Sequence, residues 1–259
     1  MVHDFNSGLN IVKKVLALDF ACEERDFDEE GVFIHEASEM RGRWRLPSRE
    51  KSLMVATMGS GVLIGCSAGR LGWVKANLRG LSPDNIFDIS TVARLQNYVS
   101  HDNQEIRLEL KYICVPDTFK PYVPSEDIEI NLAEGEKQLE LYNDKRFPNT
   151  LGHSNNPRRA AVFATCNSNI TGVAAASADC DVMWQIGVDT LPAYRNRGIG
   201  KATVSALTEN LLSKGILPYY STRFFNIASR RTAISLGYRP AWVELYSREL
   251  KTEGGNPSF

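Results

Sequence analysis

Two glycines and three cationic side chains stand close together near the middle of the second half of the chain. Residues 195–201 read Arg-Asn-Arg-Gly-Ile-Gly-Lys. Glycine lets a backbone come close to a ligand, and the first-turn N–H groups of a helix have no partner inside the helix. The positive end of the helix dipole also favours negative charge. The pattern therefore predicts a phosphate-binding loop that opens a helix.

Two common phosphate loops do not fit this run. A P-loop needs a glycine at position 195 and a serine or threonine at position 202, where the chain has Arg195 and Ala202. The dinucleotide fingerprint needs a third glycine at position 203, which is Thr203. Neither nucleoside triphosphate nor dinucleotide binding is predicted.

The segments around the loop predict strands and helices in a fixed order. Residues 182–188 are short, apolar and free of proline, and Asp-Thr-Leu-Pro ends them, which favours a buried strand. Helical spacing of apolar residues follows the loop up to Lys214-Gly215. A second strand is predicted over 216–222, and Asn226 is a candidate N-cap for a helix that ends at Gly237.

Arg-x-x-Gly-x-Gly-x-Ala after a strand and a proline turn resembles the signature of the GNAT acetyltransferase superfamily, Gln/Arg-x-x-Gly-x-Gly/Ala. The spacing from Asn226 to Gly237-Tyr238 is similar to the second motif of that superfamily, Asn…Gly-Phe. The resemblance covers the C-terminal half. It implies a GNAT-like acyltransferase fold of the α/β class with a mixed sheet, which uses acetyl-CoA as co-substrate.

The resemblance also implies which residues hold acetyl-CoA. Pantetheine amides would pair with the strand over 187–190, where the N–H of Val188 would polarise the thioester carbonyl, and the pyrophosphate would lie on the loop over 195–202. Asn226 is either an N-cap alone or also a cofactor contact. The expected cofactor-binding residues are Gly187, Val188, Thr190, Arg195, Asn196, Arg197, Gly198, Ile199, Gly200, Lys201, Ala202, Asn226 and Ser229.

The usual acid and base of the superfamily are absent from their expected positions. Ala233 stands where many members have a tyrosine that acts as the general acid, and Gln185 stands where some have a glutamate that acts as the general base. Asp189 lies two strand steps from Gln185 on the same face, so it is the first candidate base, or it simply caps the turn. The candidate acids are Tyr219, Tyr220, Tyr238 and Tyr246, of which Tyr238 and Tyr246 are preferred.

Composition bounds the class of protein. The chain has 259 residues, 43% of them hydrophobic, and a net charge of −1, which argues against general binding of nucleic acid or a membrane surface. No signal peptide and no membrane helix are predicted, because charged residues interrupt every apolar run. Five scattered cysteines without a Cys-x-x-Cys pair indicate reduced thiols and a cytoplasmic location.

Three prolines within nine residues, from Pro116 to Pro124, predict a linker. The expected domains are therefore an N-terminal mixed α/β domain over 1–124 and a GNAT-like domain over 125–259. In the N-terminal domain, we expect a hairpin over 52–57 and 62–66, a helical region opened by Ser82-Pro83 and a strand over 106–115. The region before residue 50 is charged and its apolar residues show little periodicity. In the second, we expect a strand over 128–132, a helix over 134–142 and a hairpin over 159–166 and 169–177.

These observations predict an N-acetyltransferase that moves acetyl from acetyl-CoA to a primary amine of a small molecule or peptide by direct attack. The alternative is a non-catalytic acyl-CoA-binding or sensing module. The N-terminal domain would shape the substrate cleft, or it is a degenerate copy of the same fold, or it forms a homodimer. No metal is expected, because His35, His101 and His153 show no ligand spacing.

Overall fold

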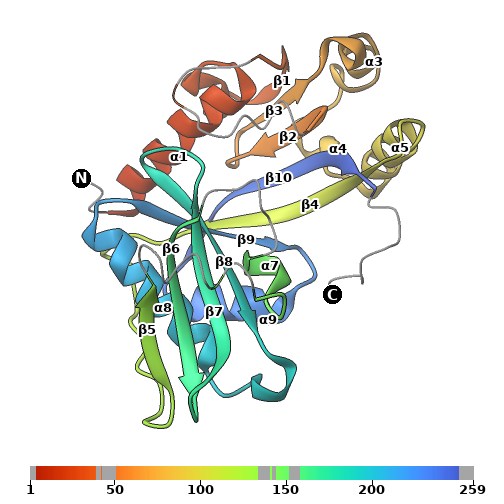
Figure 1. The fold of residues 1–259 in the computed structure, drawn as a ribbon. Helices are drawn as coiled ribbons and strands as arrows, with labels where there is room; N and C mark the ends of the chain where they lie inside the picture. Colours follow the sequence, from red (N-terminus) through yellow and green to blue (C-terminus); the bar gives the residue numbers. More distant parts are fainter. Residues whose placement is uncertain are drawn as a thin grey trace. The chain divides into compact units, whose positions relative to one another are not determined.

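The computed structural model of the chain describes residues 4–38, 42, 51–133, 141, 144–151 and 158–250. Its secondary structure is mixed α/β, and it forms two compact units (Figure 1). Unit 1 contains residues 1–11 and 112–240, and unit 2 contains residues 12–111 and 241–259. The chain thus changes unit three times, whereas the prolines predicted one boundary after Pro124.

Unit 1 contains a sheet in the order β9-β8-β7-β6-β5. Its strands are β5 (Glu129–Ala133), β6 (Arg158–Cys166), β7 (Asn169–Ala178), β8 (Met183–Thr190) and β9 (Leu217–Arg223). Neighbours are antiparallel except β8 and β9, which are parallel. The strand and hairpin predictions for this half are confirmed, except that β8 is mostly half-buried where a buried strand was expected. Asn167 and Ser168 turn the β6–β7 hairpin with positive φ angles.

Three helices are described in unit 1 after its first strand: α7 (Pro148–Leu151), α8 (Ile199–Ser213) and α9 (Ile227–Ser235). The prediction of a helix that starts directly after the loop is confirmed, and Gly215 ends it with φ +73°. Asn226 caps α9, because its side-chain oxygen accepts a hydrogen bond from the N–H of Ser229 at 3.1 Å. The helix predicted over 134–142 lies, apart from Leu141, outside the described residues.

Small residues in β7 allow α8 to pack closely on the sheet of unit 1. Val173 and the three alanines that follow it are fully buried, and α8 lies against β6, β7 and β8. A Cβ added to Gly172 would come within 2.5 Å of Ile199 Cγ2. The first residue of α8 therefore occupies the space above Gly172, and this contact sets where the helix begins.

Unit 2 contains a sheet in the order β1-β3-β2-β10-β4. Its strands are β1 (Gly31–Glu36), β2 (Leu53–Thr57), β3 (Gly61–Cys66), β4 (Gln104–Ile113) and β10 (Arg239–Glu249), of which β4 and β10 run across the division between the units. The β2–β3 hairpin is confirmed, with Gly59 in its turn at φ +130°. In contrast, β1 pairs with β3 in parallel.

The helices of the first hundred residues differ in part from the sequence expectations. The structure has α1 (Phe5–Phe20), the 3-10 turn η1 (Glu24–Phe27), α3 (Ala68–Leu78), α4 (Pro83–Ile86) and α5 (Ile89–Ser100). The expectation of a poorly periodic first stretch was wrong, since Val12, Leu16 and Phe20 bury one stripe of α1. Two lysines interrupt this apolar pattern in the sequence but lie outside the buried stripe of the helix. One of them, Lys13, forms an ion pair with Asp28 at 2.6 Å.

The helical region expected after Ser82 is two helices. Ser82 caps α4 by accepting from the N–H of Asn85 at 3.3 Å, but α4 ends at Ile86 and Asp88 precedes the start of α5 in extended conformation. Leu95 and Val99 are then fully buried in the core of this unit. Within the described ranges, no helix is long and apolar enough to cross a bilayer. All five cysteines are free.

Buried charges connect β4 and β10 in unit 2. The Nζ of Lys111 lies 2.7 Å from a carboxylate oxygen of Glu109 and 3.3 Å from one of Glu244, and Lys51 pairs with the other oxygen of Glu244. Burial by itself would raise the pKa of Glu244, but the two ammonium groups outweigh it and lower that pKa to about 2. The carboxylate is therefore ionised in the folded protein down to strongly acidic pH.

We expect Glu244→Gln to lower the free energy of unfolding at pH 7 by about 3 kcal/mol, because it leaves two buried ammonium groups with one carboxylate. The pKa of Glu244 is about 2 when folded, against an ordinary value of 4.5, so its contribution is complete above pH 4.5 and is lost as the pH falls toward 2. Denaturant titrations at pH 7 and pH 3 measure the effect, with exposed Glu249→Gln as control. A deficit of equal size at both pH values contradicts this assignment.

Candidate functional site

The second half of β8 is paired on one edge only. β8 pairs with β7 from Gly172↔Thr190 to Ala178↔Trp184, but its register with β9 ends at Ile186↔Tyr220. Beyond Ile186, no strand pairing of β8 with β9 is recorded for the described residues. The predicted cofactor residues Gly187, Val188 and Thr190 lie in this segment. Its free backbone groups can pair with the amides of an extended ligand.

The loop between β8 and α8 opens the helix as predicted, with left-handed backbone at two of its residues. After the turn η2 (Pro192–Tyr194), Asn196 and Gly198 have φ angles of +64° and +81°. Gly198 is the N-cap of α8, and the first intrahelical bond runs from the N–H of Ala202 to the carbonyl of Gly198 at 2.8 Å. The N–H groups of residues 199–201 therefore have no acceptor in the helix and can bind an anion.

The two glycines of the loop make room for different neighbours. A Cβ on Gly198 would collide with the hydroxyl of Tyr122, and one on Gly200 would come within 3.0 Å of Thr190 Oγ1. Gly200 therefore lets the first turn of α8 approach the end of β8. Gly198 supplies both the left-handed backbone conformation and the space in which Tyr122 lies.

Residues 122–127, around the last of the three prolines, contact α8 and the cationic side chains of the loop. The N–H of Tyr122 donates to Ser205 Oγ at 2.9 Å, and the Lys201 ammonium lies 4.5 Å from the centre of the Tyr122 ring. Arg197 forms an ion pair with Asp127. The pKa of Asp127 is lowered by the hydrogen bond from Ser125 and by the positive charge of Arg197. An anion on this loop would compete with Asp127 for Arg197.

Asn226 and Ser229 use their side chains inside unit 1. Besides the cap bond from Asn226 to the Ser229 N–H, the Ser229 hydroxyl lies 2.9 Å from the hydroxyl of Tyr220. Burial raises the pKa of Tyr220 to about 12. The structure thus brings these three side chains together at the start of α9, beside the strand that runs parallel to β8; their contact with a cofactor stays a prediction.

The carboxylate of Asp189 caps helix α7. One oxygen accepts from Asn149 Nδ2 at 2.8 Å and the other accepts from the backbone N–H of Thr150 at 2.7 Å. The sequence left two roles open for Asp189, a catalytic base or a cap of the turn that follows it. In the structure Asp189 is a cap, but of helix α7, which lies about forty residues earlier in the chain. Both oxygens are therefore engaged without a substrate.

The two preferred acids lie in different surroundings. Tyr238 is 2% exposed, its hydroxyl lies 2.7 Å from Thr208 Oγ1, and burial raises its pKa well above the usual range. Tyr246 belongs to unit 2, where its hydroxyl donates to Glu109 at 3.0 Å and burial again raises its pKa. Tyr238 is held in the core against α8, and both phenols stay protonated at neutral pH.

A buried polar group next to Gln185 was missed by the sequence reasoning. The hydroxyl of Tyr219 lies 2.6 Å from Asp179 Oδ2 and 3.1 Å from Gln185 Oε1. Asp179 is 3% exposed, and its Oδ1 is buried without a hydrogen-bond partner among the described residues. Tyr219 was only one of four candidate tyrosines, and Asp179 had no signal because it follows the strand β7 rather than standing in a motif.

Two further buried hydroxyls lie on the same face of the sheet. Ser177 is paired directly with Gln185, so their side chains share a face, and Thr150 lies over Gly187. Within the part of the chain that the structure describes, neither hydroxyl has a hydrogen-bond partner. We call this set the polar row; it consists of Thr150, Ser177, Asp179, Gln185 and Tyr219. Buried groups left unpaired in this way are typical of a site completed by water or a ligand.

The comparisons with known proteins agree with the motif in the loop. Residues 161–242 match the family model described as GNAT acetyltransferase. This match contains β7, β8, the loop, α8, β9 and α9, together with most of β6. The comparison with curated protein sequences finds no match.

Several solved structures are similar at low identity. A GCN5-related N-acetyltransferase from Kribbella flavida has 15% identity and a TM-score of 0.45, and the match covers 61% of this chain and 65% of that one. A GCN5-related N-acetyltransferase-like protein from Streptococcus suis has 16% identity and a TM-score of 0.48, with 62% and 68% covered. A Drosophila protein has 12% identity and a TM-score of 0.49, with 96% and 91% covered.

With TM-scores below 0.5 for these structures, the assignment depends on the family match and on the local geometry. The matched residues contain the strand that is paired on one edge only, the left-handed Gly198 and the helix start that follows it. Over residues 161–242, this chain is similar to the GNAT acetyltransferase family.

Proposed function

We propose that this protein is an N-acetyltransferase that moves the acetyl group of acetyl-CoA to a primary amine by direct attack. The observation that carries the proposal is the arrangement of residues 187–202. A strand with one free edge leads into a left-handed glycine and a helix start with three unpaired N–H groups, within a GNAT acetyltransferase match. The acceptor would be a small molecule or a peptide.

Acetyl-CoA would lie along β8 and end on the loop. The pantetheine amides would pair with the backbone from Gly187 to Thr190, and the N–H of Val188 would polarise the thioester carbonyl. The pyrophosphate would accept from the N–H groups of residues 199–201, with Arg195, Arg197 and Lys201 supplying positive charge. This placement requires Asp127 to release Arg197 when the cofactor binds.

The acceptor amine would reach the thioester from the face that carries the polar row. Its nitrogen forms a bond to the carbonyl carbon, the carbon–sulfur bond breaks with its electron pair on sulfur, and the CoA thiolate takes up a proton. The amine also loses a proton, which Asp179 can accept directly or through the hydroxyl of Tyr219. Asp179 has a free carboxylate oxygen for this role, whereas both oxygens of Asp189 are engaged by α7.

The alternative of a non-catalytic acyl-CoA-binding module rested on Gln185 and Ala233 replacing the usual base and acid. The polar row supplies another candidate base. The hydroxyl of Tyr219 lies within hydrogen-bond distance of both Gln185 and the carboxylate of Asp179. Catalysis is therefore the function that the site supports best. The free thiols fit a reducing compartment such as the cytoplasm.

We expect the protein to bind acetyl-CoA and Gly198→Ala to bind it at least about tenfold more weakly, since the substitution strains a left-handed backbone and collides with Tyr122. The matched control is Gly215→Ala, which has the same kind of strain at φ +73° but nothing within 4 Å of the added Cβ. Calorimetric titration of both variants measures the effect. Equal affinities of the two variants for acetyl-CoA, or no binding of acetyl-CoA to the unchanged protein, would contradict the proposed cofactor site.

We expect Asp127→Asn to tighten acetyl-CoA binding a few-fold at low salt, because the phosphates no longer compete with a carboxylate for Arg197. Added salt should reduce the gain, as exposed charges are screened. Glu126→Gln is the control, since it changes the net charge equally in the neighbouring residue. A gain of the same size in the control would mean that the overall charge, and not the pair with Arg197, is responsible.

We expect Asp179→Asn to lower kcat on the order of a hundredfold with unchanged affinity for acetyl-CoA, because the amine then loses its proton acceptor. The assay is CoA release with a panel of amino acids, small amines and a peptide as acceptors. Exposed Asp181→Asn is the control. A normal kcat in Asp179→Asn combined with a low kcat in Asp189→Asn would assign the base to Asp189 instead.

A further inference from the structure

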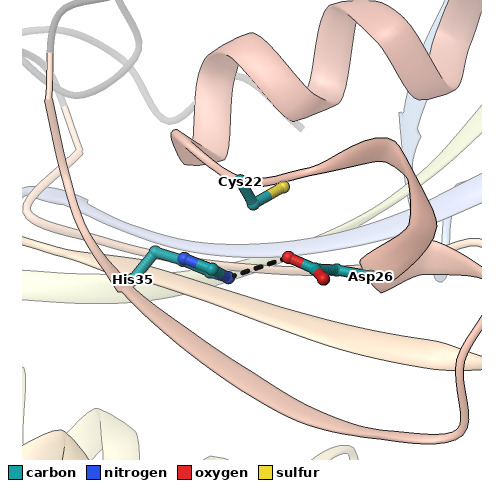
Figure 2. Close-up of side chains that lie close together, drawn as sticks. All are labelled: Cys22, Asp26 and His35. Carbon is teal, nitrogen blue, oxygen red and sulfur yellow. Dashed lines mark ion pairs between the residues drawn. The ribbon is translucent and has the colours of Figure 1, made fainter.

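A cysteine, an aspartate and a histidine lie together in unit 2. Figure 2 shows Cys22, Asp26 and His35 close together, with the ion pair between His35 and Asp26 marked. We propose that Cys22 Sγ, a carboxylate oxygen of Asp26 and Nε2 of His35 bind one Zn²⁺ ion. This inference does not depend on acetyl transfer, and either proposal can fail alone.

The distances suit a shared metal ion. The three ligand atoms lie within 4.8 Å of one another, and His35 Nε2 lies 3.2 Å from Asp26 Oδ2. Zinc binds sulfur at about 2.3 Å and nitrogen or oxygen at about 2.0–2.2 Å in a tetrahedron, so its ligand atoms are separated by roughly 3.3–3.7 Å. The separation between His35 and Asp26 already suits this range, and rotamer changes that move the ligand atoms by up to about 1 Å would bring all three separations into it.

Three different elements deliver the ligands, and the fold holds each of them. Cys22 follows the end of α1, Asp26 lies in η1 and His35 lies in β1. The last residue of α1, Phe20, packs over Gly65, where a Cβ would come within 3.2 Å of its ring. Gly65 is in turn the register partner of His35. The packing of α1 on β3 therefore brings Cys22 to the level of the histidine.

The aspartate is held by its own turn. A Cβ on Gly61, the first residue of β3, would collide with the backbone oxygen of Asp26, so η1 lies directly against that strand. The side chain of Asp26 also accepts from the N–H of Glu23 at 3.3 Å, which fixes its direction. The carboxylate is thus oriented before any metal binds, and little reorganisation is needed.

Burial and charge also favour a cation at this place. The Asp26 side chain is 13% exposed, and His35 Nε2 is buried without a hydrogen bond to the described residues. Residues 23–30 contain six acidic side chains and one arginine. The ion pairs Arg25–Glu23 and Lys13–Asp28 offset two of these charges, and a negative potential remains around the cluster.

The ligand set selects zinc over the hard cations. Magnesium and calcium prefer oxygen ligands, whereas a thiolate, an imidazole and a carboxylate suit zinc. On binding, the Cys22 thiol loses its proton to solvent and the sulfur coordinates as thiolate. Three protein ligands leave a fourth position for water. The ion would connect α1, η1 and β1, and so stabilise this edge of unit 2.

The test is a titration of the metal-stripped, full-length protein with Co²⁺, followed by displacement with Zn²⁺. We expect one equivalent of cobalt to give the visible bands of a tetrahedral complex and a near-ultraviolet thiolate charge-transfer band. Cys22→Ser should abolish the charge-transfer band, and Asp26→Asn and His35→Gln should weaken binding at least about tenfold. The controls are His101→Gln and Asp28→Asn, which change the same residue types in the same unit and should bind as the unchanged protein does.

Two outcomes overturn the proposal. One is the absence of tetrahedral cobalt bands in the unchanged protein, which would leave His35 and Asp26 as an ion pair without a metal. The other is a charge-transfer band that persists in Cys22→Ser. Circular dichroism shows whether the variants fold. If they do not fold, the unfolding temperature of the unchanged protein is measured with and without zinc. Zinc raises this temperature if the site exists and leaves it unchanged if the site does not.

Discussion

The close approach of helix α8 to the sheet of unit 1 is the contact on which the candidate site depends. Ile199 occupies the space above Gly172, and Gly200 lets the first turn come against Thr190. A side chain at either glycine would push the start of the helix outward. The unpaired N–H groups would then no longer follow directly from the end of β8, where the register with β9 has already ended. The proposed binding of phosphate and positioning of the thioester would both require this packing.

Local patterns predicted the elements of this site because their causes are local. Glycines, an N-cap and apolar periodicity determined β8, α8 and α9 over residues 183–235, and each was found. α1 was missed, since Lys13 and Lys14 interrupt its apolar run along the sequence although a buried stripe remains on the helix. Partners that come from distant segments had no local signal. Asp189 capping α7 belongs to this class, and so does His35 lying beside Cys22.

The polar row places a carboxylate and a phenol near Gln185, where the GNAT resemblance implies a base. Gln185 cannot act as a base, but Tyr219 and Asp179 reach the same face of the sheet from the neighbouring strand and from the end of β7. Buried polar atoms without hydrogen-bond partners are costly to keep, and the row contains three of them within the described residues. The proposed acceptor site would supply the missing partners.

The connectivity of the two units has a consequence for synthesis on the ribosome. Unit 1 includes residues 1–11, where Gly8 packs closely against Val115, and also needs residues up to 240. Unit 2 receives β10 between β2 and β4 only after residue 241 has been made. Unit 1 can therefore close only after residue 240 has been made, and unit 2 only later still. The nascent chain therefore keeps unpaired strand edges in unit 2 until β10 has been made, which makes timely shielding by chaperones more valuable than in a protein of successive domains.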